Sequence, residues 1–240
     1  LLWGWSQAGS EFVDAEAEVG MGAGRRRERY PEGSPYNRLA EVGWDTPCGD
    51  ASEVGGDGLI RTGIVDAIGG YDPGMIAGED PEMCLRVRKA GHRVVRLDEE
   101  MTLHDADIHR FGQWWKRAVR AGHAYAESAH MHGGTDERYR VKELRSIVFW
   151  GGAVPTFSLV FAPLTLGTSL VAGAAGFGLL WSKIYRYRAS RDSTEDAALY
   201  ATGVAVGKIA EMRGVLQYTW NTFVRRKKSE LIEYKDVLPE

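Results

Sequence analysis

The chain has 240 residues, 44% of them hydrophobic and 26% charged, an ordinary globular balance that allows one large domain or two small ones. The formal net charge of −3 combines an acidic stretch up to residue 139 with a basic and apolar stretch from residue 140 on. This asymmetry argues against nucleic acid as the main partner and favours a membrane surface behind a soluble face. Cys48 and Cys84 are the only cysteines. With no CxxC spacing and no secretory signal, we expect two reduced thiols in a cytosolic compartment, with a disulfide or a metal pair as the alternative.

The first 58 residues predict one surface helix, one strand and a long connection. Trp3 to Val19 carries apolar residues at a helical period, typical of an amphipathic helix, and because the chain opens on Leu1 inside this helix we expect a fragment without its natural start. Gly20 to Gly24 predicts a short strand that runs into the basic segment Arg25 to Arg29. That segment is either a solvated charge cluster or a binding site for phosphate or acceptor. Pro31 to Gly58 is rich in turn-forming residues, so we expect an irregular connection with one short helix near residues 37–44.

From Gly58 the pattern alternates between short strands and helices. A helix over residues 79–90 has apolar positions facing a core, and Gly91 stands where a left-handed residue usually ends a helix. A long helix with two tryptophans follows near residue 111. The predicted elements are strands at 59–61, 92–97 and 101–103, helices at 62–68, 79–90 and 111–130, and a turn at 69–73.

Between Arg145 and Lys183 the chain has no charged residue. This run is too long for one membrane-spanning helix and slightly short for two with a turn. Basic residues flank both ends, which places both ends in the cytoplasm and favours a tight hairpin or re-entrant pair over residues 146–162 and 165–181. The alternative is a buried helical hairpin of a soluble protein. Thr194 to Phe223 then reads as an interfacial amphipathic helix with a polybasic end, because its charges weaken a third span.

The most informative block lies in the acidic half. It contains Gly55-Gly56-Asp57, Gly69-Gly70-Tyr71-Asp72, Gly78-Glu79-Asp80-Pro81-Glu82 at the start of a predicted helix, Leu85-Arg86 and finally His104. In order and spacing, over roughly residues 45–130, the chain resembles the family 2 glycosyltransferases. The resemblance implies an α/β fold of the nucleotide-binding GT-A type, a nucleotide-sugar donor, a divalent metal and transfer of a hexosyl-type sugar with inversion.

Elementary chemistry gives Asp80 a matching task. Inverting transfer needs a carboxylate that takes the proton of the acceptor hydroxyl as the bond from the anomeric carbon to phosphate breaks. A helix N-terminus favours the ionised form of such a group. By the resemblance Asp80 is the base and Glu79 orients the acceptor or the backbone. The alternative is that Asp80 is a helix N-cap before Pro81, and we read Glu82 as a partner of the helix dipole.

The donor sugar and the metal are expected to draw on further residues. Gly56 and Gly78 permit close backbone approach, and Asp57 could accept a hydrogen bond from a sugar hydroxyl. His104 matches a family position that completes a shell around Mg²⁺ or Mn²⁺, with a structural histidine at a strand end as the alternative. The remaining metal ligands, a DxD motif, are expected upstream of Leu1. Asp14-Ala15-Glu16 imitates that motif, but its place in a surface helix favours a solvated face.

The segment Gln113-Trp114-Trp115-Lys116-Arg117 is similar to the QxxRW signature of processive members of the family. It departs from that signature because both tryptophans precede the arginine, which puts processive transfer in doubt. We expect Gln113, Trp114 and Arg117 to contact the acceptor, with Trp114 or Trp115 stacking on a sugar. Core packing near the membrane is the alternative.

Together these observations predict three parts: the C-terminal part of a catalytic domain at 1–139, a membrane hairpin at 140–185 and an interfacial tail at 186–240. The predicted function is sugar transfer from a nucleotide-sugar to a lipid-linked or envelope-polysaccharide acceptor at the cytoplasmic face of the inner membrane, among membrane lipids and without nucleic acid. The fragment alone is expected to be inactive. A catalytically inactive scaffold or regulator derived from a transferase fold is the alternative, and a transport component is ranked last because the apolar run offers only Thr and Ser as polar residues.

Overall fold

The computed structural model describes residues 9, 11–13, 15–227 and 232–235, which form two compact units, Leu1–Asp107 and Ile108–Glu240. The predicted first helix lies mostly outside the described residues, although Glu11–Val13 and Ala15 are helical. Asp14 of the DxD-like triplet and Lys228 of the polybasic end also lie outside them.

The first unit is built on a four-stranded mixed sheet in the order β2-β4-β1-β3. Strands β1 (Val19–Glu28) and β4 (Arg93–His104) run parallel at its centre. The short strands β3 (Leu59–Ile60) and β2 (Gly49–Asp50) pair antiparallel with β1 and β4 respectively. A mixed α/β fold is therefore confirmed for this unit. The two strands predicted at 92–97 and 101–103 form one strand, because irregularities in its pairing with β1 let it continue past its central acidic residues.

Helices connect the two central strands. They are η1 (Pro31–Gly33), α2 (Pro35–Trp44), α3 (Thr62–Ile68) and α4 (Glu79–Lys89), and the last three match the predicted helices closely. Buried side chains of α3 and α4, such as Ile64 and Val87, pack with Met21 and Val94 of the sheet. Gly91 has φ +89°, a conformation suited to glycine, and so ends α4 as predicted.

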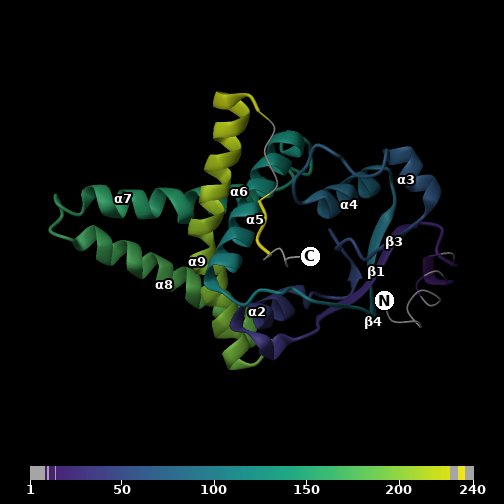
Figure 1. Ribbon diagram of the computed structural model, residues 1–240, viewed down its shortest axis with the longest axis horizontal. Coiled ribbons are helices and arrows are strands. Elements are labelled where there is room, and N and C mark those ends of the chain that lie inside the picture. The colour runs from purple at the N-terminus through teal and green to yellow at the C-terminus, as the bar shows by residue number, and fades with distance from the viewer. Residues whose placement is uncertain (1–8, 10, 14, 228–231, 236–240) are drawn as a thin grey trace, which may run out of the picture. The chain divides into compact units, whose positions relative to one another are not determined.

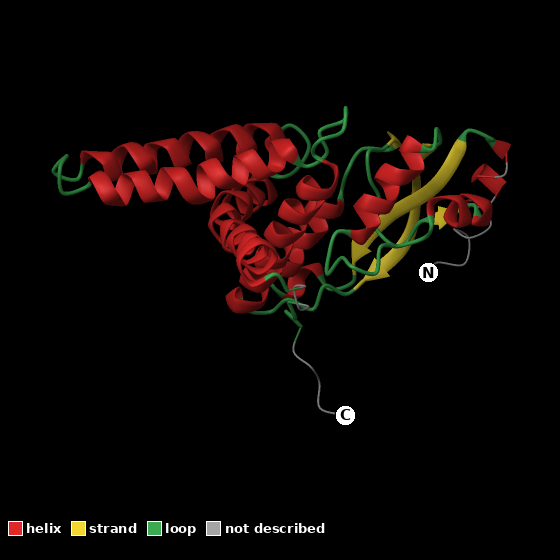
Figure 2. Ribbon diagram, turned by 90° about the horizontal axis from the view of Figure 1, so that it is seen from above, coloured by secondary structure: helices red, strands yellow, loops and turns green. Residues whose placement is uncertain are grey.

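The second unit is helical (Figure 2). Its elements are α5 (Phe111–His132), α6 (Val141–Ile147), η2 (Val148–Ala153), α7 (Val154–Phe161), α8 (Thr168–Ala189), α9 (Thr194–Thr219) and η3 (Trp220–Arg225). Helices α5 and α9 cross closely at two glycines. A Cβ atom on Gly122 would collide with the backbone of Glu211, and one on Gly214 with the backbone of Val119. The division between the units falls before α5 rather than at the predicted residue 139, because this backbone contact joins α5 to α9.

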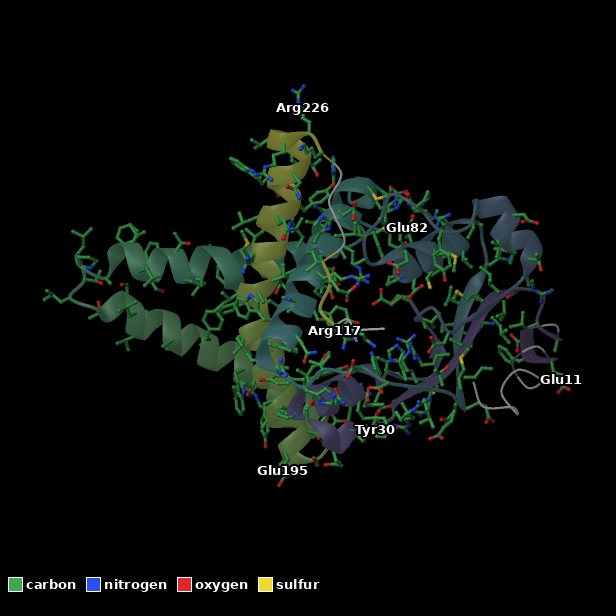
Figure 3. All side chains as sticks on the ribbon, in the orientation of Figure 1. Glu11, Tyr30, Glu82, Arg117, Glu195 and Arg226 are labelled. Atoms are coloured by element: carbon green, nitrogen blue, oxygen red, sulfur yellow. The ribbon has the colours of Figure 1, made fainter. Side chains whose placement is uncertain are left out.

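Helices α7 and α8 lie side by side and project from α9 as a hairpin (Figures 1 and 2). Figure 3 shows mostly carbon along both of them, whereas Glu195 and Arg226 mark opposite ends of the rod formed by α9 and η3. Among the described residues, one helical stretch, Val141–Phe161, is long and apolar enough to cross a membrane by length and composition. The sequence therefore identified the apolar segment correctly as helical.

Candidate functional site

A cavity of about 510 Å³ opens in the first unit beside the Gly55-Gly56-Asp57 segment. Its walls come from β1, from the connection after α2, from the N-terminus of α4 and from β4. Polar residues that line it include Arg26, Asp57, Asp80 and Arg96. Residues that stand far apart in the sequence are thus brought around one space, and Asp80 is among the residues that line it.

Asp80 occupies the first turn of α4 but is not the residue that caps the helix. The N-cap is Gly78, whose φ of +83° is the left-handed conformation that favours glycine. The Asp80 carboxylate instead accepts hydrogen bonds from the backbone N–H of Gly56 and from the phenol of Tyr71. The N-cap alternative is therefore replaced by a carboxylate held between two other segments of the chain.

The pKa of Asp80 is raised above its ordinary value, chiefly because burial disfavours the charged form, with a further contribution from the neighbouring negative charge of Glu79. The hydrogen bonds from Tyr71 and Gly56 and the charge of Arg26 act in the opposite direction but do not outweigh burial. From its place at a helix N-terminus, we expected the ionised form of Asp80 to be more strongly stabilised than the raised pKa indicates. A carboxylate with a raised pKa is a better proton acceptor once it is ionised.

Gly56 is needed for the close approach of this carboxylate. A Cβ atom at Gly56 would lie 2.9 and 3.1 Å from the two carboxylate oxygens of Asp80, closer than such atoms ordinarily pack. The predicted role of Gly56 was close backbone approach to a sugar, and the structure finds the close approach made to Asp80. Residue 56 therefore positions the carboxylate.

Three arginines of the basic segment, Arg25, Arg26 and Arg27, are partly exposed and are each paired with acidic side chains. Both oxygens of Asp57 accept hydrogen bonds from Arg26, each at 2.7 Å, and the Arg26 guanidinium lies 5.4 Å from the centre of the Trp44 ring. The neighbouring Arg25 and Arg27 also pair with acidic side chains. Asp57 was expected to meet a sugar hydroxyl, but its first partner is Arg26, and this pair fixes the glycine segment at the edge of the cavity.

A second ion pair holds the turn that carries Tyr71. The buried Glu82 carboxylate lies 2.8 Å from Nη2 of Arg86, one turn further along α4 (Glu82 is labelled in Figure 3). Arg86 in turn donates hydrogen bonds of 2.6 Å to the carbonyls of Ile68 and Gly70. Glu82 thus acts through a side-chain partner and not only through the helix dipole. Arg86 and Tyr71 were not assigned roles from the sequence, although both stand within the recognised block.

His104 lies at the end of β4, with its ring 5.1 Å from the ring of Trp44, which itself lines the cavity. Within the residues that the structure describes, no group of three or more His, Cys, Asp or Glu side chains could hold a metal ion. Both cysteines are free thiols, Cys48 exposed and Cys84 buried. Burial raises the pKa of Cys84 to about 11, so its thiol stays protonated and unreactive.

The predicted acceptor contacts on α5 belong to the second unit. The side-chain oxygen of Gln113 accepts hydrogen bonds from the backbone N–H groups of His109 and Arg110, which caps the start of α5. The Trp114 indole reaches to within 3.9 Å of the Cβ position at Gly207 in α9. Arg117, labelled in Figure 3, lies with its guanidinium carbon 6.0 Å from the ring centre of Tyr234. These contacts give Gln113 and Trp114 packing roles, and acceptor binding by the three residues stays a prediction.

Comparisons of this chain with known protein families, with curated proteins and with solved structures find no significant match in any of the three.

Proposed function

We propose that this chain carries the acceptor-activating part of an inverting glycosyltransferase with a GT-A type domain, which moves a hexosyl-type sugar from a nucleotide-sugar to a lipid-linked or envelope-polysaccharide acceptor. The observation that carries the proposal is the Asp80 carboxylate, held at the wall of a cavity by Gly56 and Tyr71. The order of the glycine turns, the acidic helix start and His104 supports it through the resemblance to family 2 transferases.

In the proposed step, the acceptor hydroxyl gives its proton to Asp80 while its oxygen forms a bond to the anomeric carbon. The bond from that carbon to the donor phosphate breaks, and its electron pair leaves with the nucleoside diphosphate. Tyr71 and the Gly56 N–H hold the carboxylate in a fixed direction throughout. Arg86 acts on the carboxylate indirectly, through Tyr71, because it donates a hydrogen bond to the turn from which Tyr71 projects.

The leaving diphosphate needs its charge neutralised, and the resemblance assigns this to Mg²⁺ or Mn²⁺ with His104 in the shell. The described side chains do not by themselves form a metal site. Arg26 and Arg96 are the cationic groups that line the cavity. Arg26 is paired with Asp57, so Arg96 is the group that supports binding of an anionic donor on this side of Asp80.

The apolar helices support a membrane location with a lipid-linked acceptor. Basic residues before α7 and after α8 favour the cytoplasmic face, where both ends of the apolar run would meet anionic headgroups. Membrane lipids are therefore proposed as partners.

Transfer of radiolabelled sugar in membranes from cells that express the complete gene tests the proposal. We expect Asp80→Asn to lower the transfer rate by about 10²- to 10⁴-fold, because the base is removed. The matched control is Asp66→Asn, which changes an exposed aspartate of α3 and should leave the rate unchanged. Unchanged transfer in Asp80→Asn would remove the assigned base, and no transfer by the wild type with a panel of donors would favour the scaffold.

The raised pKa of Asp80 also predicts a pH dependence with a definite sign. The value of kcat/KM should fall as the pH decreases through a pKa above 3.8, the ordinary value of the group, because the base becomes protonated. The effect on stability has the opposite sign, because the folded state binds this proton more tightly than the unfolded state does. The contribution of protonated Asp80 to the free energy of unfolding is therefore present below the unfolded-state pKa and is lost as the pH rises through the folded-state pKa. Asp80→Asn should therefore not lower the melting temperature at neutral pH, which a thermal scan can check.

A further inference from the structure

The hairpin of α7 and α8 ends in a turn whose composition is unusual for a surface exposed to water. The turn residues Leu164 and Leu166 are 79% and 94% exposed. Leu166 also has φ +49°, a left-handed conformation that exposed turns normally fill with glycine, asparagine or aspartate. A leucine at the most exposed, least favourable position of a turn indicates that its surroundings are apolar.

The polar groups around this turn bond to one another. The Thr165 hydroxyl donates to the Phe161 carbonyl at 2.8 Å and accepts from the Ser169 N–H at 3.2 Å. The Ser169 hydroxyl donates to the Ser158 carbonyl across the hairpin at 2.8 Å, and the Gly167 N–H bonds back to Ala162 at 2.8 Å. Hydrocarbon offers no hydrogen-bond partners, so internal bonding of this kind is what a turn placed at membrane depth requires.

The part of the hairpin that extends beyond α9 is too short to reach the far side of a bilayer, although the whole stretch Val141–Phe161 is long enough to cross one. Helix α9 crosses its base, since a Cβ atom on Gly151 would collide with the Lys208 carbonyl and the Trp181 indole donates to the Thr202 hydroxyl at 3.0 Å. From these crossings the two legs extend about 17 and 21 Å to the turn at 1.5 Å per residue. The hydrocarbon core of a typical bilayer is about 30 Å thick.

The base of the hairpin carries the groups expected at a lipid–water interface. Trp181 stacks on Tyr185 with ring centres 5.0 Å apart, and aromatic side chains of this kind concentrate at headgroup level. Lys208 and Glu211 of α9 form an ion pair of 2.8 Å beside the same level. Lysines and arginines flank the apolar run at both ends, whereas the run itself has none.

We propose that the α7–α8 hairpin enters the bilayer from one side and ends inside the hydrocarbon, so that Leu166 sits among acyl chains, while α9 lies at the headgroups and sets the depth. The partner of this surface is thus the lipid bilayer rather than a second copy of the chain. The inference deepens the proposed membrane location and does not depend on sugar transfer.

Site-specific fluorescence tests the depth directly. The full chain with Cys48→Ser, in which the remaining Cys84 is buried, is given Leu166→Cys or, as the matched control at the hairpin base, Ser190→Cys. Each is labelled with a nitrobenzoxadiazole dye and reconstituted in phosphatidylcholine vesicles containing some phosphatidylglycerol. We expect the dye at 166 to be quenched by lipids brominated on their acyl chains and to resist dithionite both before and after pores admit it to the lumen. The dye at 190 should be bleached by dithionite.

Each other outcome overturns the proposal. Bleaching at 166 only after pore formation means that the hairpin spans the bilayer, and bleaching at once means that it stays in water. A dye that resists both dithionite and brominated lipid is covered by protein, as a second copy would do. Leu166→Arg gives an independent readout in vesicle flotation: binding should fall about 10²-fold, with Ser190→Arg unchanged, whereas a tip at the far interface would tolerate the arginine.

Discussion

Strand β1 carries three consecutive arginines whose partners lie far away in the sequence. The α7–α8 hairpin has no charged residue from its turn down to Lys183 near its base, and its polar groups bond mostly within four residues. Arg25 pairs with Asp98 across 73 positions, and Arg26 with Asp57 across 31. Thr165, by contrast, bonds to Phe161 and Ser169 on either side of it. The first arrangement uses charge to position segments of a sheet, and the second hides polar groups from their surroundings.

This difference in how polar groups are paired indicates what surrounds each region. Exposed ion pairs add little to stability but fix geometry where they are bidentate and partly buried, as between Arg26 and Asp57. Locally closed hydroxyls need no outside partner, which suits a segment in lipid. The sequence distance between a polar group and its hydrogen-bond partner therefore indicates whether a region is surrounded by water or by lipid.

The largest expected effect concerns the helical unit, where α5 and α9 come into backbone contact. Gly122→Leu should destabilise the packing of α5 on α9 by about 3 kcal/mol or more, because the side chain collides with the Glu211 backbone. Hydrogen exchange of peptides from α5 and α9 measures this. Gly112→Ala in the same helix meets open space and should stabilise it by about 0.5–1 kcal/mol. Equal protection in Gly122→Leu and wild type would disprove the close crossing.

The next effect is on activity in the sheet unit. Gly56→Ala should lower the transfer rate by about 10²-fold, because its methyl group displaces the Asp80 carboxylate from its position. Sugar-transfer assays with saturating acceptor measure the loss, which should appear in kcat. The control Gly63→Ala places a methyl group in open space on α3 and should leave the rate unchanged. A normal rate in Gly56→Ala would show that the close approach to Asp80 has no catalytic importance.

A smaller effect is expected for the ion pair itself. Asp57→Asn leaves the partly buried Arg26 without its charged partner, which should lower the free energy of unfolding of the first unit by about 1–3 kcal/mol. Chemical unfolding at low and high salt measures the loss, and salt should reduce it by screening. Asp66→Asn, at an exposed position, should change stability by less than about 0.5 kcal/mol. Similar losses in both variants would mean that the pair does not hold the glycine segment.

The smallest effect is predicted for the hairpin turn. Thr165→Val keeps the shape of the side chain but removes its hydrogen bonds to Phe161 and Ser169, which should cost about 0.5–1 kcal/mol. Unfolding in detergent micelles measures the cost, and here salt should have no influence. Thr194→Val, an exposed residue at the start of α9, provides the comparison. If the loss in unfolding free energy depended on salt, as expected for Asp57→Asn, the proposed difference between the hairpin and β1 would be wrong.

Several predictions made from the sequence depend only on local pattern, and these are confirmed. The helices α2, α3, α4 and α5 lie close to the predicted ranges, and Gly91 ends α4. The run without charges is helical and breaks near Pro163. Periodicity, turn residues and hydropathy act over a few residues, so a single sequence is enough to read them.

The site was predicted only in part. Asp80 lines the cavity, and its role as a base stays a prediction. Its partners Tyr71 and Arg26 were not predicted from the sequence, nor was the hydrogen bonding by which the Gln113 side chain caps α5. The sequence also predicted two strands where β4 is continuous. A local sequence pattern does not predict which of many acidic residues will lie against a particular arginine or tyrosine.

The amino-acid sequence by itself determined the helices, the apolar run, the acidic and basic halves and the glycine and acidic turns that resemble a transferase. Only the tertiary structure decided that Gly56 touches Asp80, that Arg86 fixes the Tyr71 turn and that Gly122 brings α5 against α9. The reason is physical: those contacts join segments far apart in the chain, and their geometry is set when the whole sheet and the whole helix pair have packed.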